Sequence, residues 1–447
     1  MDRILSLLVH VLTFFARFKK FFAKHGIGEY EEWQPGQKLK ILLVGYNGAR
    51  NTGSDVRVAS IARQVADLLG KDNVEISVTT LDAYNLKGYF HKDVRMYTLP
   101  SLFPLHIFHA CSIHHAAIIC EGSTLKSTFA NALTLFMCEA AGIMAAQGKP
   151  CIAFGSEVGA MEPFLRRAAS RLCKDTYFIT RTEGSLVELE KLGLKGHAGT
   201  DAAWLYEGAI ENDEAQTYLR EQGWDGEKPL LGIAVIDPFC WPVRSSFIKW
   251  FRGHINGNMQ GQYDLWYFFS ESDERKQAFE KYVAEIARGV KDFIGEKDCF
   301  PVIMGMERLD EKACRNLREK LDVSSAMFLS GEYSADIMTG ILRQFDMLVT
   351  SRYHGAVLSM EHGCPVIAVS MDERLSRLMG DLSMDDKYLF GTADEELGRG
   401  IAAALESAWA ERDDIHERIE TKVAEYKREL TGMGEFMREY LEDHLNL

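Results

Sequence analysis

One stretch in the C-terminal half, residues 345–370, constrains the fold of this chain more than any other. A short apolar run with β-branched side chains is typical of a buried strand, and helical spacing ended by glycine and proline is typical of a short helix. The stretch predicts a strand at 347–350, a polar turn at 351–355, a helix at 356–362 and a strand at 366–370. Such a unit belongs to a parallel sheet, and open parallel sheets bind ligands where a strand ends and a helix begins.

Two side chains in the predicted turn suit such a ligand. Arg352 carries a planar guanidinium that matches a carboxylate or a phosphate, and backbone N–H groups at a helix N-terminus also attract anions. His354, two residues further on, can hold or give a proton near neutral pH. The alternative for His354 is a histidine that caps its own loop. We expect an anion grip beside a proton donor.

The alternation of strands and helices extends over most of the chain, which at 447 residues is too long for one ordinary core. Further strands are predicted at 40–45, 74–79, 116–120, 151–154, 177–180, 230–236, 266–269 and 300–304, with another strand end near 328–331. Helices are predicted at 56–69, 186–192, 274–289, 310–321 and 335–343. We predict four regions: an amphipathic helix and linker at 1–38, α/β domains at 39–205 and 228–392, and helices at 393–447.

Three successive strands of the first domain end in small or polar loops, at 121–124, 155–159 and 181–185. These loops should share one edge of the sheet, which is the expected ligand face. Arg181 has two equally supported interpretations. It is either a second contact for an anionic ligand, or it forms an ion pair with Glu183 or with another surface acid. The glycine-rich loop at 46–55 lacks both nucleotide-binding fingerprints, so a tight turn is as well supported as a site.

An aromatic and basic segment follows the first strand of the second domain. Such a mixture stacks on sugar rings or packs in a core, and core packing of a helix is favoured. Its members are Trp241, Phe247, Trp250 and Phe251, with Arg244, Lys249 and Arg252. Residues 372–377 then bring mixed charge to the end of the strand at 366–370.

The net charge limits the kinds of partner, and the cysteines indicate the cellular compartment. A net charge of −14 argues against a nucleic acid, but an anionic small substrate needs only local positive groups. Nine cysteines without a C-x-x-C motif indicate reduced thiols in a cytoplasmic protein. No metal site is predicted, because His109, His114 and His115 lack metal-like spacing with cysteines or carboxylates.

Residues 1–25 differ from the rest of the chain. They predict one amphipathic helix that is too short for a confident membrane span and lacks a signal-peptide cleavage site. Attachment to a membrane interface and packing on protein, its own or a second subunit, are equally supported. The apolar face comprises Ile4, Leu7, Leu8, Val11, Phe14, Phe15, Phe18, Phe21 and Phe22, and the basic residues Arg17, Lys19, Lys20 and Lys24 cluster towards the end.

The chain combines an Arg-x-His motif with a following helix and a Gly-x-Pro strand, here Arg352-Tyr-His354 and Gly363-Cys-Pro365. Further motif pieces lie at 45–55, 121–123, 155–159, 180–185 and 199–201. Across roughly 40–390 this pattern resembles the polysaccharide pyruvyl transferase family. Two details depart from the family pattern: the acid of the first turn falls one place later, at Asp55, and the glycine run after the third strand reads Cys120-Glu-Gly122.

The resemblance implies a GT-B-like fold, in which two Rossmann-like parallel-sheet domains face a central cleft. It also implies transfer of a pyruvyl group from phosphoenolpyruvate to a sugar of a glycan, usually as a cyclic ketal, with no other cofactor. Arg352 and His354 would be catalytic, with Arg181 assisting. The residues expected to bind substrate are Arg181, Asn51, Gly53, Asp55, Gly122, Ser123, Gly331 and Glu332.

Ketal formation needs a proton on the methylene carbon of phosphoenolpyruvate, after which a sugar hydroxyl adds to the adjacent carbon and phosphate leaves. A helix N-terminus lowers the pKa of a histidine and a bound dianion raises it, so we expect His354 to be protonated mainly in the donor complex. The alternatives are a GT-B nucleotide-sugar glycosyltransferase and a non-catalytic glycan-binding or membrane-associated protein of the same fold. If the N-terminal helix lies on a membrane, the acceptor is expected to be a lipid-linked glycan at the cytoplasmic face.

Overall fold

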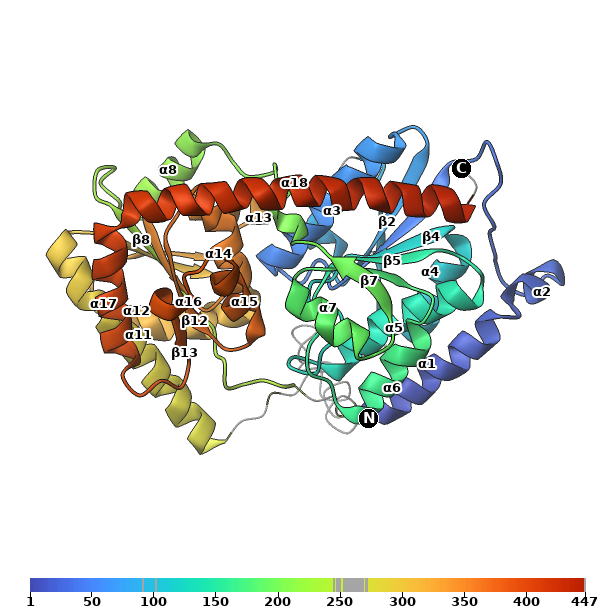
Figure 1. Cartoon of the computed structure of the whole chain (residues 1–447), viewed down its shortest axis with the longest axis horizontal. Coiled ribbons are helices and arrows are strands. Elements are labelled where there is room, and N and C mark those ends of the chain that lie inside the picture. Colours follow the sequence, from blue (N-terminus) through green and yellow to red (C-terminus); the bar gives the residue numbers. More distant parts are fainter. Residues whose placement is uncertain are drawn as a thin grey trace.

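The computed structural model describes residues 1–90, 92–100, 103–243, 246, 251, 269 and 272–445. Residues 266–268 of the strand predicted at 266–269, and most of the aromatic and basic segment at 241–252, lie outside these residues. The described chain forms two α/β domains side by side, each built on one parallel sheet (Figure 1). The predicted α/β fold with two parallel-sheet domains is therefore confirmed.

The first sheet, within the described residues, has seven parallel strands in the order β3-β2-β1-β4-β5-β6-β7. The inner strand β1 is buried on both faces, as expected of a parallel sheet covered by helices. Ile41 and Leu43 face one core, and Leu42 and Val44 face the other. The strands are β1 (Leu39–Val44), β2 (Val74–Thr80), β3 (Arg95–Thr98), β4 (Ala116–Ile119), β5 (Cys151–Ser156), β6 (Tyr177–Thr180) and β7 (Lys195–Ala198).

Helices cover both faces of this sheet, with α4, α5 and α6 packed on the face of Leu42 and α3 on the face of Ile41. The chain order changes direction beside β1, which is the position where ligands bind in open parallel sheets. The helices are α3 (Thr52–Leu69), α4 (Pro104–Ile113), α5 (Asn131–Ala146), α6 (Pro163–Leu172) and α7 (Glu183–Glu190), with 3₁₀ turns η1 (Ala83–Leu86) and η2 (Ala202–Leu205).

The second sheet, again within the described residues, has six parallel strands in the order β10-β9-β8-β11-β12-β13. Its strands are β8 (Leu230–Ala234), β9 (Phe300–Gly305), β10 (Ala326–Leu329), β11 (Met347–Thr350), β12 (Val366–Ser370) and β13 (Leu389–Gly391). Its helices are α11 (Asp273–Lys297), α12 (Glu311–Leu321), α13 (Ala335–Leu342), α14 (Tyr353–Met360), α15 (Glu373–Asp381) and α16 (Asp385–Tyr388), with a 3₁₀ turn η3 (Arg308–Asp310). Helix α8 (Asn212–Glu221) lies between the two sheets in sequence.

Two helices begin earlier than the hydrophobic pattern predicts. Helix α3 begins at Thr52 instead of residue 56, because the side chain of Asn51 accepts a hydrogen bond from the Ser54 N–H at 3.2 Å and caps the first turn. Helix α14 begins at Tyr353 instead of residue 356, because the Thr350 hydroxyl accepts from the Arg352 N–H at 2.9 Å and closes the turn. Residues 52–55 and 353–355, which were predicted as loops, therefore lie in the first turns of helices α3 and α14.

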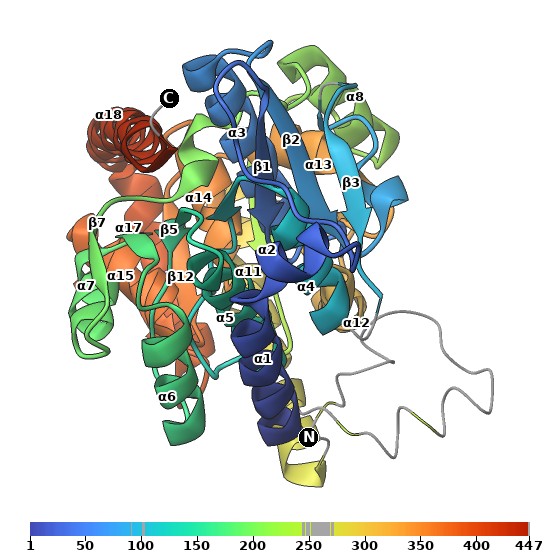
Figure 2. The same cartoon turned by 90° about the vertical axis from the view of Figure 1, so that its right-hand side faces the viewer.

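The N-terminal segment forms two helices, α1 (Asp2–Ala16) and α2 (Lys19–Lys24), instead of the one predicted. Leu5, Val9 and Ala16 are buried where α1 packs beside α5 (Figure 2). Most of the predicted apolar face remains exposed on the other side of these helices. Among the described residues, no helix is both long enough and apolar enough to cross a membrane.

Two helices follow the second sheet, α17 (Leu397–Ala410) and α18 (Arg412–Leu445). Helix α17 packs on α11, whereas α18 runs across both domains (Figure 1). Towards the second domain, Lys427 of α18 pairs with Glu361 at 3.0 Å. Towards the first domain, the carbonyl of Leu430 accepts from Gln64 at 3.1 Å. Helix α18 therefore ties the two domains together across the outside of their junction.

Candidate active site

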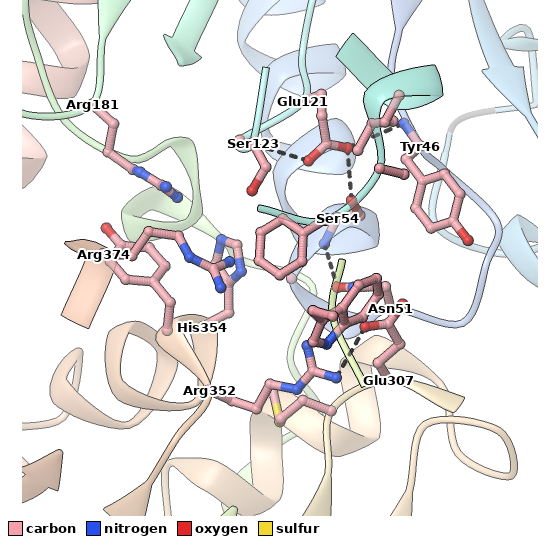
Figure 3. Close-up of a pocket in the computed structure, with 18 of the residues that line it drawn as sticks. Tyr46, Asn51, Ser54, Glu121, Ser123, Arg181, Glu307, Arg352, His354 and Arg374 are labelled. Atoms are coloured by element: carbon pink, nitrogen blue, oxygen red, sulfur yellow. Dashed lines mark hydrogen bonds and ion pairs between the residues drawn. The ribbon is translucent and has the colours of Figure 1, made fainter. Parts of the chain in front are cut away.

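A pocket of about 870 Å³, counting its open mouth, lies between the domains where the carboxyl ends of both sheets meet (Figure 3). Seven of the residues predicted from the sequence line it: Asn51, Gly53, Gly122, Ser123, Arg181, Arg352 and His354. The other lining residues are Tyr46, Ser54, Glu121, Phe129, Ala130, Leu133, Trp241, Val243, Met306, Glu307, Tyr353 and Arg374. The pocket thus brings together loops from both halves of the chain.

Backbone contacts join the two domains around this pocket. Asn51 at the start of α3 forms an isolated antiparallel bridge with Glu307, which follows β9. The Thr52 N–H donates to the carbonyl of Met306 at 2.9 Å, and the Val243 N–H donates to the carbonyl of Phe129 at 2.9 Å. The walls of the pocket are therefore fixed relative to one another by main-chain hydrogen bonds.

Arg352 reaches the pocket with part of its guanidinium already engaged. Its Nε donates to Asp310 at 2.8 Å, and its Nη2 contacts both Asp310 and Glu307, the latter at 3.0 Å. Burial lowers the pKa of Arg352, but the two carboxylates more than offset this and raise it, so the group is a permanent cation. Among the described residues none accepts a hydrogen bond from Nη1, which leaves that edge of the fork for a ligand.

His354 lies in the first turn of α14, and its ring touches the first turn of α3 in the other domain. A Cβ atom built on Gly53 would lie 2.0 Å from Nδ1 of His354, so only glycine fits there. Its Nε2 atom is buried, has no hydrogen-bond partner among the described residues, and lies 3.6 Å from Asp201. Burial lowers the pKa of His354, while Asp201 opposes that shift, so the ring is neutral at pH 7 in the free protein.

Gly53→Ala is expected to destabilise the fold by about 1–3 kcal/mol, because the new methyl group overpacks against His354. Alanine would otherwise be favoured over glycine inside a helix. In a His354→Ala background the same change should be neutral or stabilising. Denaturant unfolding of the four proteins in this double-mutant cycle measures the coupling. Additive effects of the two substitutions would contradict the contact.

Arg181 lines the pocket, but it is buried and its nitrogens are engaged by carboxylates. Its Nε and Nη2 donate to Glu157 at 2.9 and 2.7 Å, and its Nη1 donates to Asp201 at 3.1 Å. Its guanidinium also lies over the ring of Tyr353, 4.3 Å from the centroid. The structure thus gives Arg181 acidic partners, but these are the buried Glu157 and Asp201 instead of Glu183 or a surface acid.

Glu121 presents a second carboxylate to the pocket and is held by neutral donors. Its Oε2 accepts from the Tyr46 N–H and from the Ser54 hydroxyl, both at 3.2 Å, and its Oε1 accepts from the Ser123 N–H at 3.1 Å. Figure 3 shows these contacts on the first-domain side of the pocket. The carboxylate is therefore held in one orientation.

An apolar wall closes another side of the pocket. Trp241 packs edge-on against Phe129 with ring centroids 5.1 Å apart, and the guanidinium of Arg374 lies 4.6 Å from the centroid of Phe129. Trp241 therefore lines the pocket, whereas the sequence favoured core packing for its segment. Aromatic faces of this kind can stack on sugar rings, which makes this wall a surface for an acceptor.

Asp55, Gly331 and Glu332 do not line the pocket. Asp55 turns back into its own loop, where it accepts from the Gly48 N–H at 3.1 Å, and burial raises its pKa to about 7. Gly331 and Glu332 are exposed after β10. The physical reason is the strand order: β10 is an edge strand, separated from β11 by β9 and β8.

Sequence reasoning missed several residues that shape the site. Asp201 lies in a motif piece, 199–201, that signals its importance but not its contact with His354. Glu307 and Asp310 follow the strand predicted at 300–304, and a search of strand ends for acids could have found them. Glu121 directly follows the strand predicted at 116–120, so the same search could have found it.

A protein-family model matches most of this chain. The family model described as polysaccharide pyruvyl transferase matches residues 51–373. A search of curated proteins gives no significant match. The family match includes every pocket-lining residue except Tyr46 and Arg374.

Solved structures share the fold at low sequence identity. UDP-GlcNAc 2-epimerase from Neisseria meningitidis, bound to UDP-GlcNAc, is 10% identical with a TM-score of 0.55, over 91% of this chain and 100% of that one. S. aureus MnaA with UDP is 10% identical with a TM-score of 0.56, over 92% and 98%. Anabaena HepE with UDP-glucose is 12% identical with a TM-score of 0.54, over 91% and 100%. These are GT-B-like enzymes, so the predicted GT-B-like arrangement is confirmed.

Proposed function

The chain belongs to the polysaccharide pyruvyl transferase family, and on that premise we propose that it transfers a pyruvyl group from phosphoenolpyruvate to a sugar of a polysaccharide or lipid-linked glycan, forming a ketal. One observation supports this most: Arg352 and His354 reach the same interdomain pocket from a single turn. The first supplies a permanent positive charge with Nη1 open, and the second supplies a titratable ring.

In this proposal Arg352 binds the carboxylate or phosphate of the donor, and the N-termini of α3 and α14 add favourable dipoles. Protonated His354 gives its proton to the methylene carbon, and the adjacent carbon becomes cationic. A sugar hydroxyl adds to that carbon, phosphate leaves, and a second hydroxyl closes the ketal. The reaction needs no other cofactor, because the donor already carries its leaving group.

Arg181 supports the donor site through its charge and its neighbours. All three of its nitrogens donate to Glu157 or Asp201, so a direct bond to the donor would break a buried ion pair. Its positive charge still lies on the pocket wall beside Tyr353 and His354. We therefore propose that Arg181 holds Asp201 and Tyr353 in place and adds to the positive potential.

Calorimetry and a phosphate-release assay test the proposed function. Phosphoenolpyruvate should bind saturably, and uridine diphosphate should not. Incubation with phosphoenolpyruvate and methyl glycosides of galactose, glucose and mannose should then release phosphate. Binding of uridine diphosphate without phosphoenolpyruvate would favour a nucleotide-sugar glycosyltransferase instead. The absence of any donor-dependent phosphate release would count against pyruvyl transfer.

We also propose that the protein works at the inner face of a membrane, held there by an N-terminal ridge of exposed apolar residues. The ridge comprises Ile4, Leu7, Leu8, Val11, Phe14, Phe15, Phe18, Phe21 and Ile27. Ile4 is 74% exposed and Phe21 58%, and Arg17, Lys20 and Lys24 are exposed around them. An apolar face with basic flanks suits an interface containing anionic lipids. The nine unpaired cysteines support a reducing compartment.

The helix that carries the ridge begins close to a residue that lines the pocket. Asn131 donates to Asp2 in the first turn of α1 at 3.0 Å, and its neighbour Ala130 lines the pocket. A glycan whose lipid stays in the membrane would therefore meet the pocket near its apolar wall. This contact supports a lipid-linked acceptor over a free polysaccharide.

Replacing Phe14, Phe15 and Phe18 together by serine is expected to weaken binding to vesicles of phosphatidylcholine and phosphatidylglycerol by about a hundredfold or more, because three aromatic side chains no longer bury apolar area. Co-sedimentation measures the partition coefficient. Tyr84→Ser and Val187→Ser, at exposed positions on other elements, provide controls that should not change it. Substitution is a cleaner test than deletion, because removing α1 would uncover α5. Unchanged vesicle binding by the triple variant would refute the membrane proposal.

A further inference from the structure

We propose that Glu121 is the catalytic base that takes the proton from the attacking hydroxyl of the acceptor. This inference rests on the proposed pyruvyl transfer and deepens it. The mechanism so far contains an acid, His354, but no group that receives the proton of the sugar hydroxyl. A carboxylate in the same pocket can fill that role if it is fixed and lacks a cationic partner.

Glu121 is fixed in the pocket wall. It is 8% exposed and accepts hydrogen bonds from Tyr46, Ser54 and Ser123, each at 3.1–3.2 Å. Two of these donors are backbone N–H groups and the third is a hydroxyl, so none of them carries a charge. The Oε1 atom accepts only one of the three bonds, which leaves it able to accept a hydroxyl proton from the pocket.

The other carboxylate of the pocket lining differs in its partners. Glu307 pairs with the guanidinium of Arg352 at 3.0 Å, so its carboxylate is already engaged by a cation. Glu157 and Asp201 lie behind the wall and are paired with Arg181. Within the described parts of the chain, no lysine, arginine or histidine forms an ion pair with Glu121. Among the described lining residues, Glu121 is therefore the carboxylate that no cation engages.

The position of Glu121 relative to His354 suits one proton transfer to the donor and another from the acceptor hydroxyl. Ser54, which binds Glu121, directly follows Gly53, which touches the ring of His354. The proposed acid and base thus flank the first turn of α3. In the addition step the hydroxyl O–H bond breaks and its proton goes to Glu121, while a new bond joins that oxygen to the cationic carbon of the donor. The phosphate group then leaves with its bonding electron pair, and Glu121 returns the proton to phosphate or solvent.

The test compares variants of Glu121 in the donor-dependent phosphate-release assay with methyl glycosides. Glu121→Gln should lower kcat by about a hundredfold, the usual contribution of a general base, while the Kd of phosphoenolpyruvate stays within about twofold. Glu121→Ala should behave alike, and sodium formate should restore part of its rate because a small carboxylate can occupy the vacated space. Sodium chloride at the same concentration should restore nothing. Glu214→Gln, an exposed acid on α8, serves as the matched control.

Each result has a distinct meaning. A Glu121→Gln variant with kcat within about fivefold of the unaltered protein would overturn the role of Glu121. Loss of activity that formate does not rescue, together with weaker donor binding, would mean that Glu121 only shapes the pocket, and would equally overturn the proposal. If the unaltered protein released no phosphate with any acceptor, that result would contradict the proposed function itself. The role of Glu121, which depends on that function, would then be contradicted as well.

Discussion

Arg352→Ala is expected to lower kcat/KM for phosphoenolpyruvate by about a thousandfold, because the donor loses the open Nη1 edge of the Arg352 guanidinium. The same change leaves Glu307 and Asp310 buried without their cation. Breaking a buried pair in this way costs about 3–5 kcal/mol of folding free energy. Both effects are measurable, by calorimetric titration of the donor and by thermal unfolding.

Arg352→Lys separates the two effects. A lysine can pair with Asp310 or Glu307 and so preserve most of the stability, but it cannot at the same time offer a planar edge to the donor. We therefore expect a small change in Tm and a loss of donor affinity of about tenfold to a hundredfold, the range for a charge-assisted hydrogen bond. Donor affinity unchanged in the lysine variant would show that Arg352 serves the fold and not the ligand.

His354→Ala is expected to reduce kcat by about a thousandfold, as loss of a general acid does, while phosphoenolpyruvate still binds. His362→Ala, an exposed histidine just beyond the end of α14, is the matched control and should leave kcat unchanged. Steady-state phosphate release measures both. A His354→Ala variant with near-normal turnover would remove His354 from the mechanism.

The pH dependence of donor binding checks the same assignment. Burial lowers the pKa of His354 in the free protein, and a bound dianion should raise it. Donor binding then takes up a proton. The extra affinity is fully present below the free-protein pKa and is lost as the pH rises through the pKa of the complex. Titrations in two buffers of different ionisation enthalpy should detect this proton uptake, and its absence in His354→Ala would assign it to this ring.

The sequence by itself determined the elements that depend on local pattern. The strands predicted at 347–350 and 366–370 coincide with β11 and β12, because short β-branched apolar runs between polar turns specify buried strands. It also placed Arg352 and His354 in one turn, and the structure shows that both line the same pocket. Helix starts were less predictable, because the caps at Asn51 and Thr350 extend each helix into residues without apolar spacing.

Only the tertiary structure decided the partners of these residues. Arg352 pairs with Glu307 and Asp310, and His354 meets Gly53 and Asp201 across the domain junction. The strand order likewise decided that Gly331 and Glu332, at an edge strand, lie outside the pocket. The physical reason is that a chain with 65 acidic and 51 basic side chains offers many equivalent pairings, and none is encoded in local spacing. The packing of the two sheets selects which of them are buried together, and that selection forms the site.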